Sequence, residues 1–174
     1  MANRVLMQDV VRYENSRIPI FQTYFRKFQT ASNPLSKLLY RFLYRIAAHK
    51  NHIEISRNTK IGAGLYIGHP FCITINPKTI IGYNCNIHKG VTIGQENRGS
   101  RQGTPVIGNC VWIGVNATIV GKIVIGDDAL IAPNSYVNCD VPAHSVVFGN
   151  PCIIKHRENA TENYINRKCS CNIN

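Results

Sequence analysis

The chain has 174 residues, 44% of them hydrophobic, which is enough for one main domain and a small appendage. Its formal net charge of +11 favours an anionic partner, but no nucleic-acid-binding module is visible, so nucleic acid is not expected to be that partner. The seven cysteines have no paired spacing, no signal peptide is apparent and no apolar run is long enough to span a membrane, which together predict a cytoplasmic protein with reduced thiols.

Residues 1–50 are predicted to be helical and to carry most of the excess positive charge, with nine Lys and Arg residues against two acidic ones. Asn33 and Pro34 are typical of an N-cap and a first helical turn. The helix that follows has an apolar stripe made of Leu35, Leu38, Leu39, Phe42, Leu43 and Ile46. Its opposite face carries Lys37, Arg41 and Arg45. The segment is expected to cap the open end of the next domain, and residues 34–48 are also a candidate for peripheral contact with the inner face of an anionic membrane.

Within residues 51–155 an aliphatic residue returns at every sixth position. The series runs Ile55, Ile61, Ile67, Ile75, Ile81, Ile87, Ile93, Ile107, Ile113, Ile119, Ile125, Ile131 and Val137. A period of six fits neither an α-helix nor an open sheet. It predicts an all-β solenoid, a parallel β-helix in which each hexapeptide forms one short strand and one turn.

The repeat slips at two places. Ile67 and Ile75 are eight residues apart, and Ile93 and Ile107 are fourteen apart. The second interval contains the polar residues 95–104, which the interior of a solenoid cannot hold, so a loop is predicted there. Insertions in repeat proteins often map to a binding face. Residues 156–174 are polar and are expected to form a mobile tail.

His69 is the strongest candidate for catalysis, because it lies in the first slip of the repeat, where an irregular corner can reach a ligand. Histidine changes charge near neutral pH and can act as a general base. Such a base works better with a carboxylate that orients it and stabilises the imidazolium. Glu54, fifteen residues earlier and so nearly one coil away, is the best-placed acid. His88, which follows the inward-facing Ile87, is a weaker candidate to line a groove.

The chain resembles the serine acetyltransferase family, whose members are left-handed β-helix enzymes built from hexapeptide repeats. The segments that carry the resemblance are residues 53–69, 86–94 and 147–152. It implies that His69 is the catalytic base, that Glu54 replaces the family's partner aspartate, and that residues 95–104 match the family's loop between coils. It also implies a homotrimer, with acetyl-CoA in a groove between adjacent subunits and no metal.

The resemblance leads to a set of expected binding residues. The acceptor is expected to contact Gln95, Asn97, Arg98, Arg101, Thr104 and His88. The pantetheine arm of acetyl-CoA is expected to pass the backbone at Gly114 and Ala132. Its phosphates are expected to meet Lys122, Lys155 and Arg157.

Two departures from the family pattern bear on the acceptor. Gly68 stands where many members have an aspartate, and Gly103 and Thr104 stand where they have an arginine–histidine pair that helps to hold serine. The sequence therefore looks closer to the short family members of polysaccharide biosynthesis. It favours a sugar hydroxyl, in a small molecule or a lipid-linked sugar, over L-serine.

Two other functions stay open at this point. One is a non-catalytic trimeric scaffold. The other is a zinc-dependent carbonic anhydrase, which needs three histidines converging on one metal ion. His69 and His88 are alone in their coils, which disfavours this second alternative.

Overall fold

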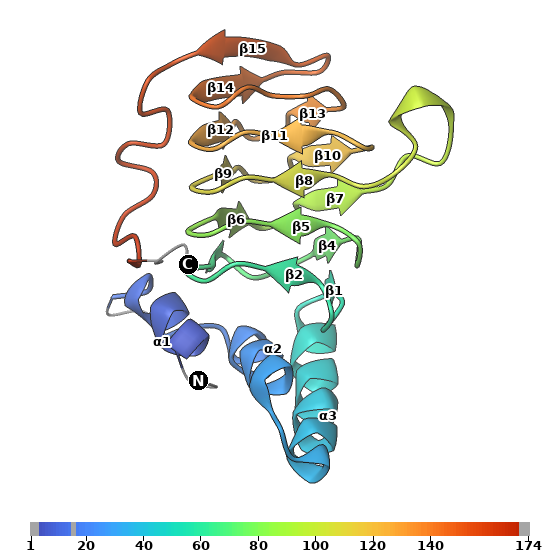
Figure 1. Ribbon diagram of the computed structural model, residues 1–174, viewed down its shortest axis with the longest axis vertical. Coiled ribbons are helices and arrows are strands. Elements are labelled where there is room, and N and C mark those ends of the chain that lie inside the picture. The colour runs from blue at the N-terminus through green and yellow to red at the C-terminus, as the bar shows by residue number, and fades with distance from the viewer. Residues whose placement is uncertain (1–3, 15–16, 171–174) are drawn as a thin grey trace.

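A computed structural model describes residues 4–14 and 17–170 of the chain. Helices occupy the N-terminal part, below a stack of short strands (Figure 1). They are α1 (Arg4–Val11), α2 (Ile20–Thr30) and α3 (Pro34–Lys50). The side chain of Asn33 accepts a hydrogen bond from the Leu35 amide, so Asn33 is the N-cap of α3 and Pro34 follows it in the first turn, as predicted.

The described strands form three sheets, in which every pair except β14–β15 is parallel. Sheet A contains β1 (Ile53–Ile55), β4 (Ile73–Ile75), β7 (Thr92–Gly94), β10 (Thr118–Val120) and β13 (Tyr136–Val137). Sheet B contains β2 (Lys60–Ile61), β5 (Ile80–Ile81), β8 (Val106–Ile107) and β11 (Val124–Ile125). Sheet C contains β3 (Tyr66–Gly68), β6 (Asn86–His88), β9 (Trp112–Ile113), β12 (Ala129–Ile131), β14 (Ser145–Phe148) and β15 (Ile153–His156).

From β1 to β13, successive strands belong to sheets A, B and C in turn, so the backbone winds into a three-sided prism of about five coils. This is the left-handed parallel β-helix that the hexapeptide period predicts. Strand β15 turns back to pair antiparallel with β14 and ends the stack. The repeated aliphatic residues lie in register inside the prism, where Ile55 pairs with Ile75 and Ile75 with Ile93. Their burial provides the main stabilisation of the solenoid.

The helices close the lower end of the prism through aromatic and small residues. Phe21, Phe25, Tyr44 and Ala47 join the same buried core as the first coil, and the Tyr44 hydroxyl donates a 2.5 Å hydrogen bond to the Ile55 carbonyl. The apolar stripe of α3 is not the covered face. Its members Leu35, Leu38, Leu39, Phe42 and Ile46 are between 54% and 77% exposed. No helix in the described residues is both long and apolar enough to cross a membrane.

A buried polar network fixes α1 and α2 to the first coil. Arg26 Nε donates to Asp9 Oδ2 at 2.7 Å, and both side chains are fully enclosed. Asp9 Oδ1 accepts from the Leu65 amide, while the guanidinium of Arg26 also donates to the carbonyls of Ile61 and Gly62. Loss of either charge would leave the other buried and unpaired, so this end of the molecule is rigidly specified.

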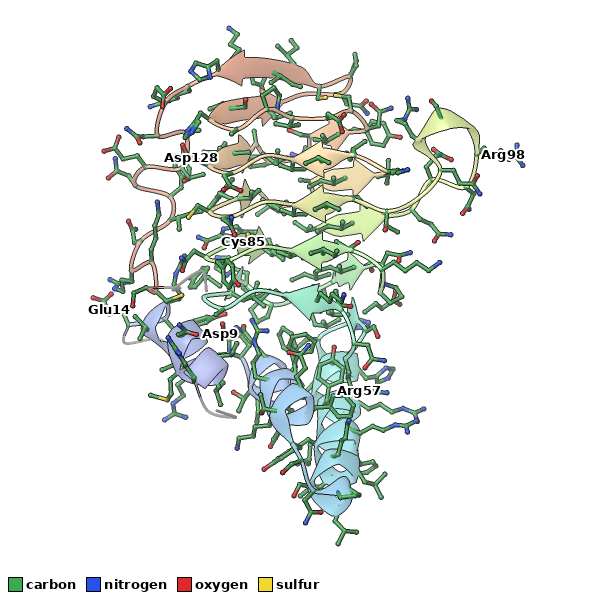
Figure 2. The ribbon with its side chains drawn as sticks, in the orientation of Figure 1. Asp9, Glu14, Arg57, Cys85, Arg98 and Asp128 are labelled. Carbon is green, nitrogen blue, oxygen red and sulfur yellow. The ribbon has the colours of Figure 1, made fainter. Side chains whose placement is uncertain are left out.

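The C-terminal segment is not the mobile tail expected from its polarity. Residues 157–170 run back along the outside of sheet C towards α1 (Figure 1). Asp128 anchors them by accepting hydrogen bonds from the Ala160 amide and from the amide and hydroxyl of Thr161. Figure 2 shows Asp128 on the side of the prism that faces this segment. Cys169 is buried near its end, and Cys171 lies outside the described residues.

Candidate active site

His69 lies on an exposed turn at the corner between sheets C and A. The coil that contains it takes 20 residues from Ile55 to Ile75, whereas the next takes 18 from Ile75 to Ile93. The extra residues form the turn 69–72, in which His69 and Cys72 have φ angles of 53° and 54°. The first slip of the hexapeptide period is therefore a protruding corner that presents an imidazole to solvent.

His88 lies directly beside this corner, in register with Gly68. A Cβ atom on Gly68 would approach His88 Nδ1 to 2.4 Å, so the histidine ring occupies the space above the glycine. On its other side the ring meets Trp112, with 4.8 Å between ring centroids. The departure from the family at Gly68 therefore has a steric reason, because a side chain there would displace His88.

The environment of His88 favours the neutral form of its imidazole. Burial lowers the pKa of His88, and the nearby His69 lowers it further. Its Nε2 atom is buried and has no hydrogen-bond partner among the described residues. A neutral imidazole with an unused ring nitrogen can donate a hydrogen bond to a ligand hydroxyl or accept one from it.

Glu54 projects outward from β1 on sheet A, one turn away from His69 along the first coil. It pairs with Thr74 across the sheet, and its Oε2 accepts a 3.4 Å hydrogen bond from the Thr74 hydroxyl. Within the described part of the single chain, no hydrogen bond or ion pair joins Glu54 to His69. A dyad between them stays a prediction. It requires either another conformation of the exposed Glu54 side chain or a contact between subunits of an assembly.

The loop of residues 95–104 projects from the corner between sheets A and B. Glu96 and Gly103 close its base by exchanging 3.0 Å backbone hydrogen bonds, and Gln95 Nε2 donates to Asn97 Oδ1 at 2.6 Å. Figure 2 shows Arg98 at the tip, pointing away from the prism. Arg101 is also exposed, and Thr104 is half-buried. Since His69 lies at another corner, a single chain does not bring this loop to the candidate base.

The expected acetyl-CoA residues divide between two places. Successive strands of sheet C align a row of positions made of Gly68, His88, Gly114, Ala132 and Phe148. At the far end of the row, the Lys155 ammonium lies 5.8 Å from the Phe148 ring centroid, and Arg157 is exposed just beyond β15. Lys122 lies elsewhere, packed against Gly103 at the base of the loop. One face of the chain therefore combines small residues, His88 and Lys155.

A pocket of about 220 Å³ opens on sheet C next to His88. Its lining includes Arg12, Tyr66, Asn86, His88, Trp112 and Tyr164. Residues from the segment after α1, from three neighbouring strands and from the C-terminal segment therefore meet around one hollow. Among the described residues, no group of three or more His, Cys, Asp or Glu side chains is arranged to hold a metal ion.

Comparison with known proteins identifies relatives of the solenoid. The family model for the bacterial transferase hexapeptide (six repeats) matches residues 104–139. The serine acetyltransferase of Helicobacter pylori (strain ATCC 700392 / 26695) is 36% identical over 110 residues, which are 63% of this chain and 64% of the relative. That of Synechococcus elongatus is 32% identical over 117 residues, 67% of this chain and 48% of the relative.

The chain is a hexapeptide-repeat protein related to the serine acetyltransferases. It spans less than two thirds of the length of these curated relatives. Solved serine acetyltransferases share its fold. The soybean apoenzyme superposes with a TM-score of 0.70 at 26% identity, covering 88% of this chain and 69% of that one. The enzyme of Brucella abortus in complex with coenzyme A superposes with a TM-score of 0.72 at 24% identity, covering 89% and 69%.

The sequence predicts His69, Glu54 and the loop as parts of a site, and these roles stay predictions. Apart from His88, it gives little sign of the pocket on sheet C. Trp112 and Tyr66 occupy outward positions of the hexapeptide, where an exposed aromatic is the available signal. Arg12 and Tyr164 carry no such signal. They reach the pocket only because α1 and the C-terminal segment pack on the solenoid, which the hexapeptide period does not describe.

Proposed function

We propose that the protein is an acetyl-CoA-dependent O-acetyltransferase. The observation that carries the proposal is the exposed imidazole of His69, placed beside the row of small residues on sheet C in a chain related to the serine acetyltransferases. Gly114 and Ala132 in this row have small side chains, and a pantetheine arm would pass their backbone. Lys155 and Arg157 supply positive charge for phosphates at the far end of the row.

In the proposed reaction His69 removes the proton of an acceptor hydroxyl. The hydroxyl oxygen forms a bond to the thioester carbonyl carbon, the carbon–sulfur bond breaks, and the departing thiolate receives the proton from the imidazolium. Glu54 stabilises the imidazolium during this step, and backbone N–H groups near the turn stabilise the oxyanion. General acid–base help of this kind contributes about 10²–10⁴ to the rate.

We propose a sugar hydroxyl as the acceptor, with L-serine as the second candidate. Gly103 and Thr104 lack the guanidinium and imidazole that would hold a serine carboxylate, which favours the sugar. The names of the relatives favour serine. The deciding experiment measures thiol release from acetyl-CoA with L-serine, free hexoses, nucleotide sugars and lipid-linked sugars. A kcat/KM of roughly 10⁴ M⁻¹s⁻¹ or more with L-serine would reject the sugar acceptor.

The same assay separates catalysis from a scaffold role. Glu54→Gln is expected to reduce turnover while leaving the affinity for acetyl-CoA nearly unchanged, because the carboxylate acts on the imidazolium. No thiol release with any acceptor on the panel would favour the non-catalytic scaffold.

Assembly and location are further parts of the proposal. A homotrimer would cover the flat faces of the prism and form the groove for acetyl-CoA.

The exposed stripe of α3 lies on a helix that also carries Lys37, Arg41 and Arg45, which suits peripheral contact with an anionic membrane at the cytoplasmic face. Co-sedimentation with anionic and neutral vesicles tests this. Equal binding to both, or none, would leave the helix with only its role under the first coil.

A further inference from the structure

The pocket on sheet C is a built site with walls from three parts of the chain. The segment after α1 contributes Arg12, sheet C contributes Tyr66, Asn86 and Trp112, and the C-terminal segment contributes Tyr164. Asn86 connects two of these walls, because its Oδ1 accepts from Arg12 Nη2 at 2.5 Å and its Nδ2 donates to the Tyr164 carbonyl at 3.1 Å. The volume of about 220 Å³ is below that of sites for drug-sized ligands and suits a single sugar unit.

Arg12 gives this pocket a positive charge that forms no ion pair with an acidic side chain of the described residues. The residue is 3% exposed, and its guanidinium donates to the neutral acceptors Asn86 Oδ1 and the Asn84 carbonyl. Among the described residues no Asp or Glu forms an ion pair with Arg12, and its buried Nε has no hydrogen-bond partner. A buried cation without an anion is costly, and burial lowers the pKa of Arg12 accordingly. A bound anion would offset that cost.

Two other arginines near Arg12 are already paired. Arg167, which also lines the pocket, forms an ion pair with Glu14. Arg26 is paired with the buried Asp9. Of these three arginines only Arg12 lacks a carboxylate partner among the described residues, so it would attract one anionic group.

The remaining walls suit the rest of a sugar ring. The rings of Trp112 and Tyr164 meet edge to face, 5.1 Å apart, and form an apolar corner. Asn86 and His88 supply polar atoms for hydroxyl groups, and His88 keeps an unused buried Nε2. His88 also borders the turn that carries His69, since its ring lies over Gly68. A ligand held at Arg12 would thus extend towards the candidate base.

We propose that this pocket seats an anionic sugar, a uronate or a sugar phosphate, with its charged group at Arg12 and a hydroxyl directed past His88 towards His69. This inference rests on the proposed acetyltransferase function and names the class of its acceptor. In it His88 is a positioning residue that hydrogen-bonds the sugar, and Arg12 is the residue that selects for charge.

Binding measured without acetyl-CoA tests the pocket independently of turnover. Isothermal titration of the full chain would compare glucuronate, glucose 6-phosphate, glucose and inorganic phosphate. The anionic sugars are expected to bind about tenfold or more tighter than glucose, since a charge-assisted hydrogen bond adds to affinity. Equal affinity for glucose and the anionic sugars would overturn the proposal, and equal affinity for inorganic phosphate alone would overturn its sugar part.

Two variants and one control locate the effect. Arg12→Gln should abolish the preference for anionic sugars, whereas Arg17→Gln, an exposed arginine of the same segment, should preserve it. Tyr164→Leu removes an aromatic wall on the C-terminal segment and should lower the binding affinity for anionic and neutral sugars by the same factor. A folded Arg12→Gln protein that keeps the preference, or a Tyr164→Leu protein with unchanged affinity for every sugar, would contradict the assignment.

The outcomes for the pocket and for the enzyme can be told apart. Selective binding of anionic sugars without thiol release from acetyl-CoA would support the pocket and reject the acetyltransferase. Thiol release with L-serine or a neutral sugar, with no preference for anionic sugars in titration, would support the enzyme and reject the pocket.

Discussion

At the scale of single residues, the turn 69–72 concentrates the chemistry of the chain. His69 is exposed there in a left-handed backbone conformation, and its neighbour His88 is enclosed by Gly68 and Trp112. Burial disfavours the charged form of the His88 imidazole and lowers its pKa. His69 is exposed to solvent and is the proposed general base.

His69→Ala should lower turnover about 10²–10⁴-fold, because it removes the proposed general base while leaving an exposed turn in place. The measurement is thiol release from acetyl-CoA with the best acceptor of the panel. His49→Ala, which changes an exposed histidine near the end of α3, is the matched control and should remain fully active. Near-normal turnover of the His69 variant would remove this residue from the mechanism.

Gly68→Ala should destabilise the fold by about 1–3 kcal/mol, since its Cβ would collide with the ring of His88. The double variant Gly68→Ala/His88→Ala removes the obstructing ring. Its free energy of unfolding should therefore be close to that of His88→Ala alone. Chemical denaturation of the four proteins gives the coupling free energy directly. Additive effects of the two substitutions would show that the ring and the glycine do not share this space.

At the scale of elements, the solenoid and its helical cap were predictable from the sequence, whereas the packing of the C-terminal segment on sheet C was not. A period of six leads to the coils because every hexapeptide repeats the same local burial, one inward aliphatic residue per strand. The C-terminal segment is held instead by individual polar contacts over long sequence distances, such as Asp128 to Thr161. Its composition resembles that of a mobile tail, so only the three-dimensional position of Asp128 reveals the anchor.

The same limit applies to α3 and to the site. The cap was expected, but the sequence did not show which face of α3 packs: the helix is buried through Tyr44, Ala47 and Ala48 and not through its leucine stripe. For the site, the slip in the period located His69, and the long interval located the loop. Arg12 could not be found in this way, because its role depends on how α1 docks on sheet C.

Acid should release the C-terminal segment before the solenoid unfolds. Burial alone would raise the pKa of Asp128, but hydrogen bonds from Thr161, His144 and Ala160 outweigh it and lower the pKa. A lowered carboxyl pKa means that its stabilising contribution is full above the ordinary value of about 4 and is lost as the pH falls below it through the folded-state value. The segment should therefore detach in that acidic window.

The single tryptophan of the chain reports this release, because Trp112 contacts Tyr164 of the segment. Its fluorescence should change below about pH 4 while far-UV circular dichroism still shows the folded solenoid. Asp128→Asn should show the altered fluorescence already at pH 7, and Glu162→Gln, an exposed acid on the same segment, should behave like the parent. Coincident fluorescence and circular dichroism transitions would rule out separate release.

At the scale of the whole molecule, the two halves of the proposed site lie on different edges of the prism. His69 occupies the corner between sheets C and A, and the loop of residues 95–104 occupies the corner between sheets A and B. Within one chain the loop and His69 therefore lie at different corners. In the proposed threefold assembly, the loop of one subunit would approach the His69 corner of the next.

Mixed trimers test this arrangement. His69→Ala subunits and subunits with Asn97, Arg98 and Arg101 changed to alanine should each be nearly inactive alone. Co-expressed in equal amounts, they should recover about a quarter of parental turnover, because a random interface combines an intact histidine from one subunit with an intact loop from the next once in about four cases. Light scattering of each preparation would check that its subunits form trimers. No recovery in mixed trimers would place His69 and the loop in one subunit's site, and full activity of the loop variant alone would remove the loop from acceptor binding.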